Sequence, residues 1–137
     1  MNSSSLANSD MLLSKARGML RALQATSEKI QASALVSHDG LTLASVLGDG
    51  VNADRFGAMC ASLLALATRA ASEVERGELR QIILDGTSGP LLLTRAGATG
   101  VLAVAAAPDA NLGKVILDTR KTASQLAALS TASGALS

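Results

Sequence analysis

Residues 79–107 read LRQIILDGTSGPLLLTRAGATGVLAVAAA, three apolar segments separated by two short turns. The segments are typical of β-strands and cover Leu79–Asp85, Pro90–Arg95 and Gly100–Ala106. The turns are GTSG and GAT, and their glycines allow the positive φ angles that tight turns need. Because loops this short join only antiparallel neighbours, the stretch predicts three hairpin-linked strands of one sheet.

Two more strands are expected upstream of this stretch. Ser33–Ser37 and Leu41–Leu47 flank the tripeptide HDG at residues 38–40, a strong hairpin signal because glycine accepts positive φ without steric cost. The chain therefore supplies five strands for a mostly antiparallel sheet.

Helical periodicity appears before, between and after the two groups of strands. It covers Asp10–Ala25, a middle helix from Asn52 or Asp54 to Glu75 or Arg76, and Asn111–Leu129. Gly77 suits the left-handed position that follows the end of the middle helix. The sequence thus predicts an α+β fold in the order α-β-β-α-β-β-β-α, with a five-stranded sheet sandwiched by helices. We expect a single domain over residues 10–129 and small, polar, flexible tails over 1–9 and 130–137.

The middle helix has a broad apolar arc beside a face of small residues, at about 100° of rotation per residue. We expect the arc to face the sheet; it holds Phe56, Met59, Cys60, Leu63, Leu64, Leu66, Ala67, Ala70, Ala71 and Val74. The small face holds Gly57, Ala58, Ala61, Ala65, Thr68 and Ser72. An exposed face of good helix formers is one interpretation. A solvated face usually carries Lys and Glu, however, so we favour a close helix–helix contact across the two-fold axis of a homodimer.

A polar edge borders this small face, where Arg55, Ser62, Arg69 and Arg76 recur every seven residues. The edge is either a solubilising surface or a contact with another protein. On the second interpretation Arg55, Arg69 and Arg76 are the partner-binding residues.

The composition argues against catalysis and against nucleic-acid binding. The chain has one Phe, no Trp or Tyr and a net charge of +1, so it lacks both stacking platforms and a basic footprint. Its single histidine, His38, and single cysteine, Cys60, cannot build the usual zinc or paired-thiol sites. We expect His38 to be a solvated turn residue and Cys60 a small core residue. No phosphate-binding glycine loop and no nucleophile elbow are present. We therefore expect no catalytic residue, no cofactor and no metal.

The hydropathy pattern predicts no membrane span. The seven apolar residues 101–107 fall far short of the ~18 that cross a bilayer. The first ten residues lack the basic and apolar regions of a secretory signal. These features favour a cytoplasmic protein.

Four segments in this order resemble the roadblock/dynein-light-chain family. They are ALVSHDGLTLAS (34–45), GELRQIILDGTSGPLLLTRAG (77–97), GVLAVAAA (100–107) and NLGKVILDTRKTASQLAAL (111–129). Within the family they look most like the bacterial MglB-like proteins that co-regulate Ras-like GTPases. The resemblance implies a homodimer whose sheets join edge to edge through strand 79–85 and whose middle helices pack antiparallel. It also implies a surface presented to a small GTPase, with no active site and no arginine finger of its own.

The small helix face and this strand together give the expected dimer interface: Ala58, Ala61, Ala65, Thr68, Ser72, Leu79, Gln81 and Ile83. The leading hypothesis is a dimeric, non-enzymatic regulator or scaffold of a Ras-like GTPase. The alternative is a dimerisation adaptor that does not distinguish nucleotide states. A small-molecule sensor is a third class, against which the scarcity of aromatic residues and of buried polar anchors counts.

Overall fold

The computed structural model describes residues 3–98 and 100–133. The elements follow in the predicted order: α1 (Ser3–Ala25), β1 (Ile30–Ser37), β2 (Thr42–Val46), α2 (Ala53–Glu73), β3 (Gln81–Gly86), β4 (Gly89–Arg95), β5 (Gly100–Ala106) and α3 (Leu112–Ser133). This order confirms the α+β fold expected from the sequence.

The five strands form one antiparallel sheet in the order β2-β1-β5-β4-β3. The β3–β4 hairpin pairs Gly86 with Gly89, which leaves a two-residue turn of Thr87 and Ser88. The longest crossover places β5 beside β1, where Leu35 pairs with Leu102. As a result β5 and β1 are central, while β2 and β3 are the edge strands.

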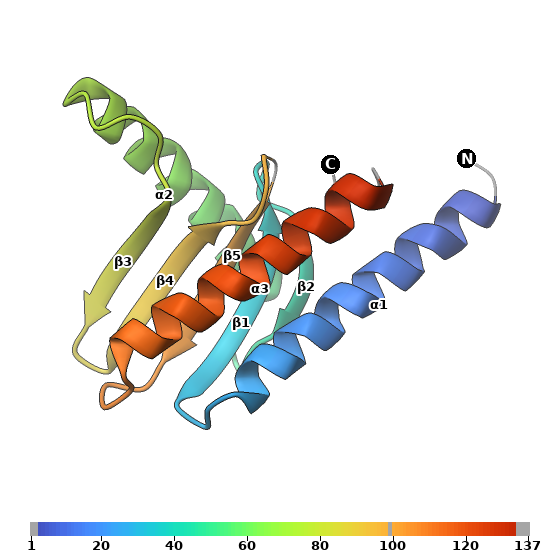
Figure 1. The fold of residues 1–137 in the computed structure, drawn as a ribbon, viewed down its shortest axis with the longest axis horizontal. Coiled ribbons are helices and arrows are strands. Elements are labelled where there is room, and N and C mark those ends of the chain that lie inside the picture. Colours follow the sequence, from blue (N-terminus) through green and yellow to red (C-terminus); the bar gives the residue numbers. More distant parts are fainter. Residues whose placement is uncertain (1–2, 99, 134–137) are drawn as a thin grey trace.

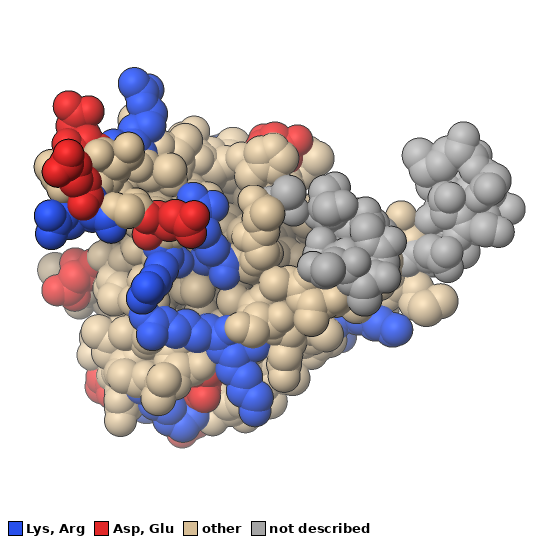
Figure 2. All heavy atoms as spheres, turned by 45° about the horizontal axis from the view of Figure 1, so that its top comes forward, with Lys and Arg blue, Asp and Glu red and all other residues tan. Residues whose placement is uncertain are grey.

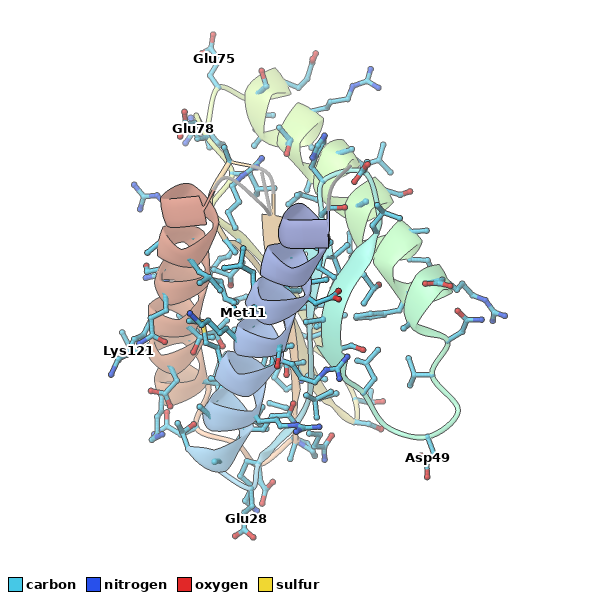
Figure 3. The ribbon with its side chains drawn as sticks, turned by 90° about the vertical axis from the view of Figure 1, so that its right-hand side faces the viewer. Met11, Glu28, Asp49, Glu75, Glu78 and Lys121 are labelled. Atoms are coloured by element: carbon cyan, nitrogen blue, oxygen red, sulfur yellow. The ribbon has the colours of Figure 1, made fainter. Side chains whose placement is uncertain are left out.

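Helices cover both faces of the sheet and bury a separate cluster on each. Figures 1 and 3 show α1 and α3 side by side on one face and α2 alone on the other. The first face buries residues such as Leu20, Leu92, Leu102 and Leu126. The second buries the smaller set Ala34, Val36, Cys60, Leu64, Leu93, Val101 and Ala103. A single helix therefore lies on this second face and leaves part of it open, which matters for the surface described below.

The outer helices are longer than the periodicity predicted. α1 begins at Ser3 and α3 ends at Ser133, so both run into the segments 1–9 and 130–137 that we expected to be tails. No Gly or Pro stands between Ser3 and Asp10 to stop a helix, and Leu6 and Ala7 favour one more than the serines beside them. Residues 1–2 and 134–137 lie outside the described part of the chain.

Two strands begin two or three residues from the predicted positions, while β2 and β4 begin within one residue of theirs. β1 begins at Ile30 instead of Ser33, because the buried Ile30 still pairs with Ala106 of β5. β3 begins at Gln81 instead of Leu79. The carbonyl oxygen of Leu79 accepts a hydrogen bond from Arg95 Nε at 2.7 Å, so a side chain takes the place of a strand partner there.

The start of α2 lies where the sequence predicted it, whereas its end does not. Asn52 caps the first turn, since its Oδ1 accepts from the Arg55 amide at 3.0 Å. The last turn closes earlier than predicted: Glu75 N donates to Ser72 O at 3.0 Å, and Arg76 N donates to Ala71 O at 2.8 Å. This pair of bonds is a Schellman motif in which Glu75, with φ 57°, holds the left-handed position that we assigned to Gly77.

Candidate interaction surface

The sheet-facing side of α2 is rotated relative to the predicted arc. Gly57, Cys60 and Leu64 are its buried residues, whereas Met59 and Leu66, which we placed in the arc, are 56% and 64% exposed. Gly57 explains the rotation. A Cβ at this position would collide with Thr42 Oγ1 and lie 2.8 Å from the Gly40 carbonyl oxygen, so only glycine lets α2 approach the β1–β2 hairpin this closely.

Several of the small residues predicted for a dimer contact also lie against their own chain. Ala58 and Ala61 lie beside Gly40 at the tip of the hairpin. Thr68 Oγ1 donates to Leu64 O at 2.7 Å and accepts from Arg95 Nη2 at 3.1 Å. Small side chains thus let α2 approach the hairpin here, and Ala58 stays exposed; a dimer contact through these residues remains a prediction.

The remaining residues predicted for the dimer interface fall into two groups. Ala65 and Ser72 are exposed on α2, and Ile83 is 40% exposed on β3. Gln81 is half-buried at the first position of β3. Leu79, also half-buried, precedes the strand and packs against the cluster under α2.

An apolar surface remains open between α2 and the edge strand β3. We define the apolar flank as Met59, Leu63 and Leu66 of α2, Ile82 and Leu84 of β3, and Leu91 of β4. Leu63, Ile82 and Leu91 pack partly against the cluster beneath α2. Met59 and Leu66 flank Leu63 at i−4 and i+3, so all three share one side of the helix. Leu84, 40% exposed, lies opposite Leu91 in the strand register.

The apolar flank adjoins a free sheet edge. In the described residues β3 pairs with β4 alone, so its outer N–H and C=O groups face away from the sheet. Figure 1 shows β3 at one border of the sheet, with the C-terminal end of α2 above its first residues. Sequence reasoning missed Met59 and Leu66 as surface residues. The signal that could have found them was Gly57, because its missing side chain allows another backbone to approach closely.

The predicted arginine stripe is only partly realised. Arg55 and Arg69 are exposed on α2, two helical heptads apart. Arg76 lies beyond the end of the helix, where its Nε donates to Val74 O at 3.0 Å. The stripe therefore comprises Arg55 and Arg69, because the Schellman turn redirects the chain before Arg76.

The two residues that we considered for chemistry lie in a turn and in the core: His38 in the β1–β2 turn, and Cys60 in the cluster beneath α2. His38 is exposed in the hairpin turn, as expected. Next to it, a hydrogen bond from Ser37 Oγ lowers the pKa of Asp39. Cys60 is 3% exposed, and burial raises the pKa of its thiol to about 11, which keeps it protonated and unreactive near neutral pH.

Across residues 3–98 and 100–133, no three His, Cys, Asp or Glu side chains are grouped so as to hold a metal ion. Over the same part of the chain, no helix combines the length and the apolar character needed to cross a bilayer.

Comparison with known sequences relates the chain to one domain family. The family model of the Roadblock/LC7 domain matches residues 16–106, from within α1 to the last residue of β5. The protein MJ0310 of Methanocaldococcus jannaschii, described as uncharacterized, is 34% identical over 102 residues, which cover 74% of this chain and 89% of that protein.

Solved structures share the fold at lower identity. Myxococcus xanthus MglB has a TM-score of 0.81 at 19% identity, over 88% of this chain and 90% of that one. A structure described as MglB with tetrameric arrangement has a TM-score of 0.79 at 22% identity, over 91% of this chain and 93% of that one. Both comparisons show the arrangement of helices and strands found here.

Proposed function

The chain belongs to the Roadblock/LC7 domain family, and on that premise we propose that it is a dimeric, non-catalytic regulator or scaffold of a Ras-like small GTPase. The observation that carries the proposal is the apolar flank beside the free edge of β3. Large apolar side chains next to unpaired strand groups favour association with a second copy of the same surface.

The proposed dimer pairs the two β3 strands and packs the two α2 helices against each other. Its contacts on β3 comprise Gln81 and Ile83, and on α2 Ala65 and Ser72 border the contact from the far side of the Arg55–Arg69 stripe. To these we add Met59, Leu66 and Leu84, the exposed apolar residues of the flank. Pairing satisfies the outer backbone groups of β3, and burial of Met59 and Leu66 removes apolar area from water at about 25 cal/mol per Å².

Dimerisation also brings two copies of the Arg55–Arg69 stripe onto one assembly. We propose that this stripe contacts the switch segments of the GTPase, which the γ-phosphate orders and which differ between nucleotide states. Exposed arginines at the rim of such a contact act mainly on encounter rate and specificity, and their effect is screened over about 8 Å at physiological ionic strength. The proposed role is cytoplasmic and uses no cofactor, metal or nucleotide of its own.

The test measures association with a Ras-like GTPase of the same organism, starting with one encoded beside this chain. The GTPase is loaded with GDP or with a non-hydrolysable GTP analogue. We expect tighter binding to the GTP form and weaker binding at high salt. The double variant Arg55→Glu, Arg69→Glu should reduce the association rate.

A matched control is available on the opposite face of the sheet. Arg17→Glu, Arg21→Glu makes the same charge change at two exposed positions of α1 and should leave binding unchanged. Equal affinity for both nucleotide forms would favour the alternative, an adaptor that does not distinguish them. Equal effects of the two double variants would mean that the partner does not use the Arg55–Arg69 stripe.

A further inference from the structure

The outer side of α1 and α3, which faces away from the sheet, carries a surplus of positive charge. Among the charged residues of the two helices, Asp10 and Asp118 are acidic and six are basic. These six exposed side chains define the basic face: Lys15, Arg17 and Arg21 of α1, and Lys114, Arg120 and Lys121 of α3. The remainder of the chain has the opposite balance, with six basic and nine acidic residues. A net charge of only +1 therefore conceals one distinctly positive side.

The residues at the middle of the basic face point away from the sheet. Arg21 is two residues from the buried Leu23, which places it about 160° round α1 from that core side chain. Lys121 stands in the same relation to the buried Thr119 of α3. Figure 3 shows Lys121 projecting outward from α3, with Asp49 on the far side of the sheet. Figure 2 shows Lys and Arg side chains spread over this side of the molecule, with a group of acidic side chains at the upper left, near the end of α2.

The positive charge is largely uncompensated within the chain. In residues 3–98 and 100–133, the ion pairs are Lys114–Asp118 and Lys29–Asp109, both at 2.6 Å. Lys114 is thus the one member of the basic face with an acidic partner there, and the other five take part in no ion pair of that part of the chain. An anionic surface laid against the two helices would relieve the repulsion among these like charges.

An exposed leucine stands among the cations. Leu117 is 67% exposed, and Lys114 and Lys121 flank it at i−3 and i+4 on the same side of α3. On α1, Ser14 and Gly18 precede Arg21 on one side of the helix, and neither projects far. The outer side is therefore low, with long cationic side chains and one large apolar side chain rising from it. Such a combination matches a bilayer surface, where phosphate groups lie above hydrocarbon.

We propose that the basic face docks the protein peripherally on an anionic phospholipid membrane. Groups of about four to eight Lys and Arg on a helical surface are typical of contacts with anionic lipid. The charges are spread along two helices instead of lining a groove. Lipids can move laterally to meet such an array, whereas the carboxylates of an acidic protein have fixed positions. The Lys and Arg side chains bind the phosphate groups, and Leu117 enters the boundary between headgroups and acyl chains.

The proposed dimer would double this surface. Pairing of two β3 edges extends one sheet, so the two-fold axis is perpendicular to it and both basic faces lie on the same side. The two copies of α2, with the Arg55–Arg69 stripe, then face away from the membrane. The doubling rests on the proposed dimer, whereas a single protomer already carries a complete basic face.

The first experiment measures co-sedimentation with vesicles of phosphatidylcholine and phosphatidylglycerol, mixed at about 70:30, and with vesicles of phosphatidylcholine alone. We expect binding to the anionic vesicles only, and weaker binding as salt screens the charges. Arg21→Glu, Lys121→Glu cancels the net charge of the two helices and should weaken binding by about tenfold or more. The control Arg55→Glu, Arg69→Glu makes the same charge change on the opposite side of the sheet and should bind vesicles like the original chain.

A second experiment locates the membrane contact. The chain has no Trp, so a single introduced indole reports its own surroundings. Emission from Leu117→Trp should shift to shorter wavelength with anionic vesicles, because the indole leaves water. The control is Leu41→Trp, where the leucine is 63% exposed and follows Gly40, which lies against α2. Its emission should not change.

Four results would overturn the proposal. They are absence of binding to the anionic vesicles, equal weakening by the two double variants, equal shifts from the two tryptophans, and binding to polyglutamate as strong as to the vesicles. The last result would assign the basic face to an acidic protein. Neither experiment requires a GTPase or a dimer, so failure of membrane docking is distinguishable from failure of the proposed function.

Discussion

At the scale of single residues, Glu75 holds a backbone conformation that ordinary side chains avoid. Its φ of 57° places it in the left-handed region, which costs a non-glycine residue about 1 kcal/mol or more. Glu75→Gly removes this strain while the Schellman bonds from residues 75 and 76 remain. We expect the free energy of unfolding to rise by about 0.5–1 kcal/mol in urea denaturation.

The matched control for this substitution is Gly77→Ala. Gly77 also has a positive φ, of 80°, and no atom lies within 4 Å of a Cβ built there. The added methyl therefore tests backbone strain without a steric clash, and the free energy of unfolding should fall by about 1 kcal/mol. If Glu75→Gly lowered stability as Gly77→Ala does, the left-handed conformation of Glu75 would be wrong.

Cys60 makes stability depend on pH in the alkaline range. Its thiol pKa is raised from 9.0 to about 11 in the fold because burial disfavours the thiolate. The unfolded chain therefore releases this proton at lower pH than the native protein. The stabilising effect is complete below pH 9 and is lost as the pH rises from 9 towards 11.

The measurement compares the original chain with Cys60→Ala over this pH range. The variant loses buried volume and is less stable at neutral pH. Its stability should decline less between pH 9 and 11, and the native thiol should react with a disulfide reagent only as the protein unfolds. Parallel pH curves for the two proteins would contradict the assigned burial of Cys60.

At the scale of elements, the contact between α2 and the β1–β2 hairpin depends on a missing side chain. Gly57→Ala would force a methyl group against Thr42 Oγ1 and the Gly40 carbonyl, and displacing backbone is expensive. We expect the free energy of unfolding to fall by about 1–3 kcal/mol, measured by denaturant titration.

The same substitution at Gly18 of α1 is expected to change the free energy of unfolding in the opposite direction. It too is a helical glycine, yet nothing lies within 4 Å of a Cβ built there. Gly18→Ala should raise stability by about 0.5–1 kcal/mol, because alanine has the higher helix propensity. A similar change at both positions would mean that α2 does not approach the hairpin closely.

The elements differ in how well the sequence predicted them. Hairpins are local, so the turns at residues 38–40 and 86–89 indicated which strands pair, and the whole α+β order followed. The orientation of α2, in contrast, depends on residues that are distant in the sequence. Its helix wheel has apolar or small residues almost all round, and the choice between Leu66 and Ala61 as the inward side depends on Gly40 and Thr42, which lie on another element.

The candidate sites were still harder to predict. Arg76 was placed on a helical stripe because the sequence gives no sign that Glu75 would end the helix in a left-handed turn.

At the scale of the whole molecule, the distribution of covering helices is uneven. α1 and α3 together cover one face of the sheet, and α2 alone covers the other (Figures 1 and 3). The apolar flank is the consequence, because one helix does not cover the whole width of a five-stranded sheet. A second α2 from a partner protomer would cover the remainder, and the pairing of two β3 edges would set the two-fold axis.

This arrangement predicts that Leu66→Glu converts a dimer into a folded monomer. Leu66 is 64% exposed in the protomer, so a carboxylate there is solvated in the monomer and costs little. In the dimer it would be buried twice, once on each side of the axis, and should raise the dissociation constant by about a hundredfold or more. The control is Leu117→Glu on α3, where the leucine is 67% exposed but lies on the opposite face of the sheet. Light scattering across a micromolar concentration series should show dimers for the original chain and for Leu117→Glu, and monomers for Leu66→Glu. A monomeric original chain, or a Leu66→Glu variant that dimerises normally, would mean that the apolar flank has another occupant.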